Sequence, residues 1–320
     1  MATGEVEEVL EVLDSCIPRV KWRLRAAAKR RLETEISMAD ILALCTELRP
    51  VVMVDYGGKM PELQENLCAL LHLCHKETSV LQPLRVMVIE DMIYLIHVKG
   101  LADYALLSLS SCSQLLFVDL EQDPPRMLLQ TQQNIVASQL TSIQKLFSST
   151  FSVNEMKDDA LPDVPLPMKN EGVESSEQAA DGLSHVGELV AYQSSVFIDL
   201  SSCMQDTEVT LPTLNGWLLG YPIVYLFSKE HVADAVYNLS TKALNLFKVV
   251  VGRNKTSSKG PCQEELLSFT VPYDLSMGGE NEPWAVAFLT HMQAKFERCK
   301  QTWRYLRMEV SECYPQSIAL

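Results

Sequence analysis

The sequence predicts an α/β fold in which a mixed, largely buried sheet has flanking helices and is interrupted by a disordered acidic insertion. Short segments rich in β-branched residues alternate along the chain with longer segments of helical period, as strands and helices do in α/β proteins. Apolar residues make up 47% of the 320 residues, enough for a large core. Residues 152–191 contain nine acids, two lysines and no aromatic residue, so little apolar area is available there to offset the entropy of ordering.

The N-terminal segment is expected to be helical. Apolar side chains between residues 5 and 17 recur at helical spacing, and Pro18 ends that pattern. A second helix is expected to continue to Leu32, and it would carry the basic stretch 19–31.

The boundaries of the next elements are indicated by residues typical of helix caps and turns. Ser37 and Asp40 form a capping box that opens a helix, which must end before Pro50. The apolar run 84–98 has a turn signal at Glu90–Asp91, which predicts a β-hairpin. The other elements expected in this part of the chain are a strand at 51–55, a helix at 61–76, a helix at 101–112, a strand at 115–120 and a helix at about 126–149.

The C-terminal half repeats the alternation of strands and helices without repeating the sequence of the first half. Its expected elements are strands at 195–200 and 222–227, a helix at 229–245, strands at 246–251 and 265–271, a helix at 283–300 and a strand at 304–310. The predicted organisation is an N-terminal helical segment at 1–36, a first half of the α/β domain at 37–151, the acidic linker at 152–191 and the second half at 192–320.

Four segments of this chain carry a family resemblance: RPVVMVDYG, LRVMVIEDMIYLIHVKGL, LLFVDL and LNGWLLGYPIVYLF. In that order they resemble a vertebrate family of uncharacterised proteins named for an open reading frame on human chromosome 1. The resemblance covers segments from about residue 40 to the last strand. It implies no activity, ligand or catalytic residue.

The charge and the apolar pattern limit the classes of partner. A formal net charge of −14 argues against general affinity for nucleic acid or anionic membrane, because that affinity requires clustered cations. The most apolar segment, WLLGYPIVYLF, is shorter than the roughly 18 residues of a membrane span. The nine cysteines are odd in number and irregularly spaced, so we expect reduced thiols and a cytoplasmic or nuclear protein.

Three predicted strands end in aspartate, at Asp55, Asp119 and Asp199. If these strands are parallel neighbours, their carboxylates share one edge of the sheet and could hold Mg²⁺ for phosphoryl chemistry. The alternative is that each aspartate accepts hydrogen bonds from the turn that follows its strand. The turn interpretation is favoured, because such turns are common in α/β proteins.

The predicted helix at 61–76 carries a candidate zinc site. Cys68, His72 and His75 are spaced i, i+4 and i+7 and lie on one helical face, away from the leucine stripe. Zinc in a structural site needs a fourth ligand, and no paired Cys-x-x-Cys lies nearby. A partly exposed histidine face without metal is therefore the favoured interpretation, and we expect no cofactor.

The stretch 19–31 contains seven basic residues, no acid and Trp22. Such a helix could contact nucleic acid, anionic lipid, the acidic face of a partner or an import receptor, or it could be solvated or pair with carboxylates of this same chain. The solvated or intramolecular role is favoured. With no phosphate loop, nucleophile elbow or dinucleotide fingerprint in the sequence, we expect a non-enzymatic interaction protein with an unknown protein partner. The alternative is a metal-dependent phosphate-processing enzyme that uses the strand-end aspartates.

Overall fold

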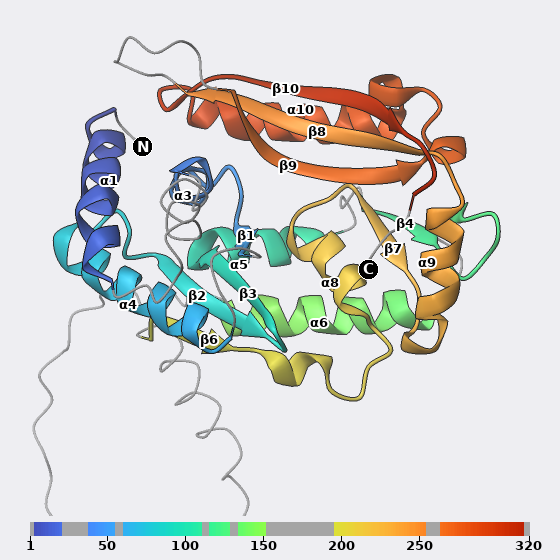
Figure 1. Ribbon diagram of the computed structural model, residues 1–320, viewed down its shortest axis with the longest axis horizontal. Coiled ribbons are helices and arrows are strands. Elements are labelled where there is room, and N and C mark those ends of the chain that lie inside the picture. The colour runs from blue at the N-terminus through green and yellow to red at the C-terminus, as the bar shows by residue number, and fades with distance from the viewer. Residues whose placement is uncertain are drawn as a thin grey trace, which may run out of the picture.

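The computed structural model describes residues 3–20, 38–54, 60–110, 115–128, 134–151, 195–253 and 263–316 (Figure 1). The helices and strands before the acidic insertion are α1 (Thr3–Cys16), α3 (Met38–Cys45), β1 (Val51–Met53), α4 (Glu62–Glu77), β2 (Leu84–Ile89), β3 (Met92–His97), α5 (Val98–Ser108), β4 (Leu116–Asp119), β5 (Arg126–Met127) and α6 (Ile135–Phe151). Those after it are β6 (Phe197–Asp199), α8 (Leu211–Leu218), β7 (Ile223–Leu226), α9 (Val232–Ser240), β8 (Leu244–Arg253), β9 (Gln263–Pro272), α10 (Pro283–Arg298) and β10 (Trp303–Cys313).

The first sheet has the strand order β1-β3-β2-β6. Its centre is the predicted hairpin of β2 and β3, whose turn places Glu90 in the left-handed region at φ 52°. Both faces are buried, because Val86 and Val88 belong to one apolar core while Met87 and Ile89 belong to the other. β6 joins parallel to β2, so the sheet is mixed, as the sequence predicts.

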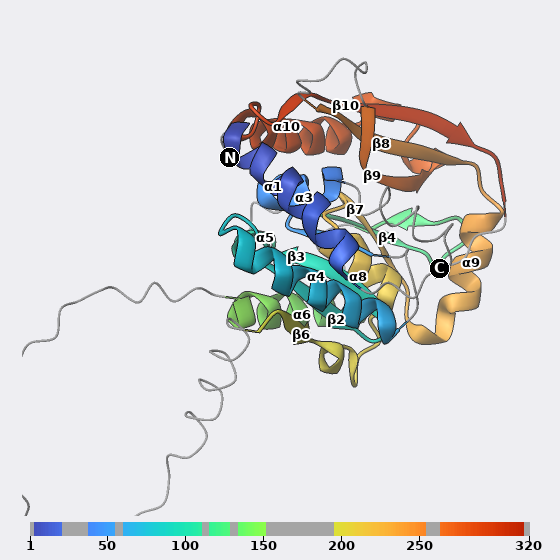
Figure 2. The ribbon, with the colours of Figure 1, turned by 60° about the vertical axis from the view of Figure 1, so that its left-hand side comes forward.

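The other two sheets each have three strands. In the order β5-β4-β7, the pairing of β4 with β7 is parallel and that of β4 with β5 is antiparallel. The strands β10-β8-β9 form a fully antiparallel sheet, against which α10 lies (Figures 1 and 2). The α/β class is confirmed, and the strands are divided among three sheets where the sequence alone suggested one.

Aromatic side chains fill the core between α5, α6 and α8. Trp217 is fully buried, its ring stacks on Tyr104 at 5.8 Å between centroids, and the Phe147 ring meets it edge-on at 5.3 Å. Its indole Nε1 donates a hydrogen bond to the Ser108 hydroxyl at 3.1 Å. These ring contacts and this hydrogen bond anchor α8 to α5 and α6.

Some predicted elements differ from the structure. The helix α8 was not predicted. It begins at a cap where the Thr210 hydroxyl accepts from the Thr213 backbone N–H, and it has proline in its first turn. The predicted helix 229–245 is wrong at its end, because the chain is already in β8 from Leu244. The predicted helix at 126–149 is wrong at its start, where β5 adds a short edge strand before α6 begins.

Two sheets contain strands from both sides of the predicted linker 152–191, because β2 pairs with β6 and β4 pairs with β7. The linker itself lies outside the described residues. If a specific protease site is inserted near residue 175 and cleaved, we expect the two fragments to stay associated in size-exclusion chromatography. Separation of the fragments into two folded species would contradict these strand pairings.

Candidate functional site

Asp119 and Asp199 each accept hydrogen bonds from the turn that follows their strand. One carboxylate oxygen of Asp119 accepts from the Glu121 backbone N–H at 2.9 Å, and partial burial raises the pKa of the Asp119 carboxyl. One oxygen of Asp199 accepts from the backbone N–H and the hydroxyl of Ser201, at 2.9 and 2.6 Å. Both contacts are those of the turn interpretation.

The strands that lead to the three aspartates are not neighbours. Asp119 ends β4 and Asp199 ends β6, and these strands belong to different sheets. β1, which leads toward Asp55, lies at the opposite edge of its sheet from β6. Asp55 itself lies outside the described residues, so its role stays a hypothesis.

The candidate zinc ligands lie on α4, as predicted. His72 is exposed, while Cys68 and His75 are half-buried. Burial raises the pKa of the Cys68 thiol to about 11, and burial together with Arg85 lowers the pKa of His75. Within the described ranges, no three side chains of histidine, cysteine, aspartate or glutamate are grouped as a metal site.

Most of the basic stretch 19–31 lies outside the described residues. Its first member, Arg19, donates to a Glu77 carboxylate oxygen at 3.0 Å, and both side chains are about half exposed. For Arg19, this contact agrees with the intramolecular pairing that the sequence favoured for this stretch. The other six basic residues stay untested.

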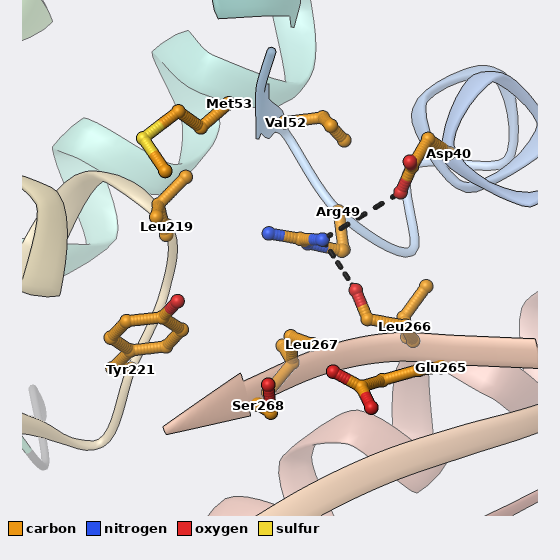
Figure 3. A pocket seen from close by; sticks show the side chains of 10 residues that line it. All are labelled: Asp40, Arg49, Val52, Met53, Leu219, Tyr221, Glu265, Leu266, Leu267 and Ser268. Atoms are coloured by element: carbon orange, nitrogen blue, oxygen red, sulfur yellow. Dashed lines mark hydrogen bonds and ion pairs between the residues drawn. The ribbon is translucent and has the colours of Figure 1, made fainter. Parts of the chain in front are cut away.

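A different residue, Arg49, gives the structure its most distinctive buried charge. The loop between α3 and β1 fixes its backbone, because Glu47 takes the left-handed region at φ 54° and the Arg49 N–H donates to the Ala43 carbonyl at 3.1 Å. The Arg49 side chain is only 9% exposed. It extends from the start of β1 toward β9 (Figure 3).

The guanidinium of Arg49 is incompletely paired. Its Nη1 donates to the Leu266 carbonyl and lies 3.9 Å from an Asp40 carboxylate oxygen. Its Nε is buried and has no hydrogen-bond acceptor in the described part of the chain. The other terminal nitrogen points away from both partners, into a cleft (Figure 3). Burial lowers the pKa of Arg49, and the nearby Asp40 opposes that change.

The cleft lies where β1, the turn before β7 and β9 meet, and its volume is about 240 Å³. Tyr221 lies across it from Arg49 (Figure 3). This site was not predicted from the sequence, in which its signal is an arginine two residues before a buried strand. The lining residues are Asp40, Arg49, Val52, Met53, Leu219, Tyr221, Glu265, Leu266, Leu267 and Ser268.

A second feature is found where the sheet β10-β8-β9 ends near α9. Leu244, at the start of β8, pairs with Pro272 on β9 and with Cys313 on β10. Tyr273 and Tyr314 are the next residues on those two strands, so both tyrosines leave the sheet at the same end.

Two further large side chains belong to the segments that adjoin this end of the sheet. Tyr237 is in the last turn of α9, which leads directly into β8, and Met277 follows the turn that begins at Tyr273. The tyrosine surface is the name used below for these four residues, which are exposed as follows: Tyr237 61%, Tyr273 37%, Met277 68% and Tyr314 85%.

The fold and the cleft define the class of the protein as a mixed α/β domain with a partly paired buried arginine, and its described residues include no group of three side chains that could hold a metal ion. The chain belongs to the family described as a domain of unknown function, DUF4504, whose model matches residues 14–320. No curated protein and no solved structure matches it. In the described part of the chain, no helix is long and apolar enough to cross a membrane.

Proposed function

We propose that this protein is a non-enzymatic interaction protein that binds a partner protein through the tyrosine surface. The observation that carries the proposal is the placement of three exposed tyrosines and Met277 at one end of the sheet β10-β8-β9. Tyrosine is enriched at the energetic centres of protein interfaces, since it buries a large area and loses few rotatable bonds. Exposed apolar groups that gather in one place mark interaction sites more often than scattered ones do.

The charges around the tyrosine surface define the partner's chemistry. Asp274 and Glu312 are exposed beside Tyr273 and Tyr314. Asp123 forms an ion pair of 2.7 Å with Lys242, and hydrogen bonding to Asp123 raises the pKa of that lysine, with Asp274 adding to the effect. Of the four charged residues named here, three are acids and one is a cation that is already paired, and tyrosine faces attract cations. The partner surface that fits is apolar with arginine or lysine side chains among its contacts.

We propose the cytoplasm or nucleus as the compartment. All described cysteines are free thiols, and most of them are buried. Burial raises the pKa of Cys45 to about 12 and that of Cys203 to about 11, which keeps both thiols protonated and unreactive. From the four segments quoted in the sequence analysis, we also propose that the chain is related to the vertebrate proteins named for an open reading frame on human chromosome 1.

The test compares two double variants in cells. Tyr237→Ser with Tyr314→Ser removes exposed area at the tyrosine surface, whereas Leu106→Ser with Leu107→Ser removes exposed apolar area from α5. All four side chains are exposed, so both variants should fold. By proximity labelling, we expect partners of the native chain to be recovered about tenfold less with the tyrosine variant and unchanged with the leucine variant.

The same experiment reports on partner chemistry. A photo-crosslinking residue in place of Tyr237 should capture a segment that contains arginine or lysine, and binding of the purified partner should weaken with salt. Equal recovery of all partners with both double variants would contradict the proposal. So would partners that are lost only with the leucine variant.

The alternative, a metal-dependent phosphate-processing enzyme, rests on Asp55, Asp119 and Asp199. Among the described residues Asp119 and Asp199 have turn partners of their own and lie in different sheets. No observation favours this alternative over the interaction function.

A further inference from the structure

We propose that the cleft around Arg49 binds a small monocarboxylate with an apolar body. This site is separate from the tyrosine surface, and its function does not depend on the interaction function proposed above. The proposal rests on three observations: the unused donors of Arg49, the acids beside it and the apolar walls of the cleft.

The first observation is the hydrogen-bonding state of Arg49. Nη1 already has the Leu266 carbonyl and the Asp40 carboxylate as partners, while the buried Nε has no acceptor in the described ranges. Nε and the remaining terminal nitrogen form one edge of the planar guanidinium, the edge on which a carboxylate accepts two parallel hydrogen bonds. A buried donor without an acceptor costs free energy. A bound carboxylate would supply the missing acceptor and partly offset that cost.

The second observation is the charge of the cleft, which disfavours a doubly charged ligand more than a singly charged one. Asp40 and Glu265 line the cleft together with Arg49. The Glu265 carboxylate is 3.2 Å from the Lys248 ammonium and is partly neutralised by it. A dianion such as phosphate would be repelled by both carboxylates at short range, whereas a monocarboxylate meets about half of that repulsion and still accepts hydrogen bonds from the guanidinium.

The third observation is the apolar wall. Val52, Met53, Leu219 and Leu267 line the cleft, and Tyr221 and Ser268 add hydroxyl groups. Its volume of about 240 Å³ exceeds the roughly 150 Å³ cavity that holds benzene and is below the range of drug-sized pockets. A ligand of this class is therefore an aromatic acid or a short aliphatic acid.

The test uses benzoate and hexanoate as probes, with benzamide and inorganic phosphate as controls. A ligand that binds only the folded state raises the melting temperature in a saturable way. We expect at least one of the two acids to do so with the native chain, and to bind about tenfold more tightly than benzamide or phosphate in calorimetry. Benzamide binding as tightly as benzoate, or neither acid binding, would overturn the proposal.

Two variants locate the binding site. Ser268→Leu places a larger side chain in the cleft and leaves Arg49 in place, so the acid should bind about tenfold more weakly. Ser311→Leu, on the exposed part of β10, is the matched control and should bind like the native chain. Arg49→Gln should abolish binding if it folds. Undiminished binding by folded Ser268→Leu would show that the acid binds elsewhere, and the assignment would then be wrong.

Discussion

Replacing Trp217 with alanine should lower the free energy of unfolding by about 3 to 5 kcal/mol, the range found when a large buried aromatic side chain is removed. Trp217 is fully buried and contacts the rings of Tyr104 and Phe147. The variant would leave a cavity between α5, α6 and α8, and it would also remove the hydrogen bond to Ser108. Chemical denaturation followed by circular dichroism measures the change.

Trp217→Phe is the control for that prediction. Phenylalanine keeps most of the ring contacts and loses the indole N–H, so the expected cost is no more than about 2 kcal/mol. An alanine variant that loses less than about 1 kcal/mol would be incompatible with the described packing around α8.

Gly252→Ala should destabilise the sheet β10-β8-β9 by about 1 to 3 kcal/mol, the usual cost of overpacking. A Cβ atom at Gly252 would lie 2.3 Å from Cε1 and 2.7 Å from Cζ of the Tyr305 ring on β10. The ring would have to leave its position, where it also stacks with the Arg307 guanidinium at 5.5 Å.

A double-mutant cycle separates the effect of this clash on stability from the effect of the lower backbone flexibility of alanine. In the Tyr305→Ala background the ring is absent, so adding Gly252→Ala should cost close to nothing. If Gly252→Ala is equally destabilising in both backgrounds, contact with Tyr305 is not the reason for glycine at this position.

The elements that the sequence predicted well are those specified locally. The hairpin of β2 and β3 has a turn signal in its own residues, and Glu90 takes the conformation that such a turn requires. Asp119 and Asp199 are the last residues of their strands, and each accepts a hydrogen bond from the backbone N–H two residues further on, an arrangement that depends on a few neighbouring residues.

The elements that were missed depend on distant contacts. α8 is only eight residues long, and its Gly216 matters because a Cβ there would lie 3.3 Å from Val224 on β7. The division into three sheets depends on which strands, distant in the sequence, pair with one another. Hydrophobic periodicity and strand propensity do not predict that pairing. Arg49 was not a candidate, because one arginine among 27 basic residues becomes notable only when its burial is known.

The pairing of β2 with β6 has a consequence for synthesis on the ribosome. About 110 residues separate the end of β2 from the end of β6. At a translation rate of about 5 to 20 residues per second, the edge of β2 therefore stays unpaired for roughly 5 to 20 s before β6 is made. During that interval the nascent chain exposes an apolar strand edge, which is a site for wrong pairing with other chains. The acidic, proline-containing stretch at 152–191 is made in the same interval, and its negative charge would repel other copies of the unfinished chain.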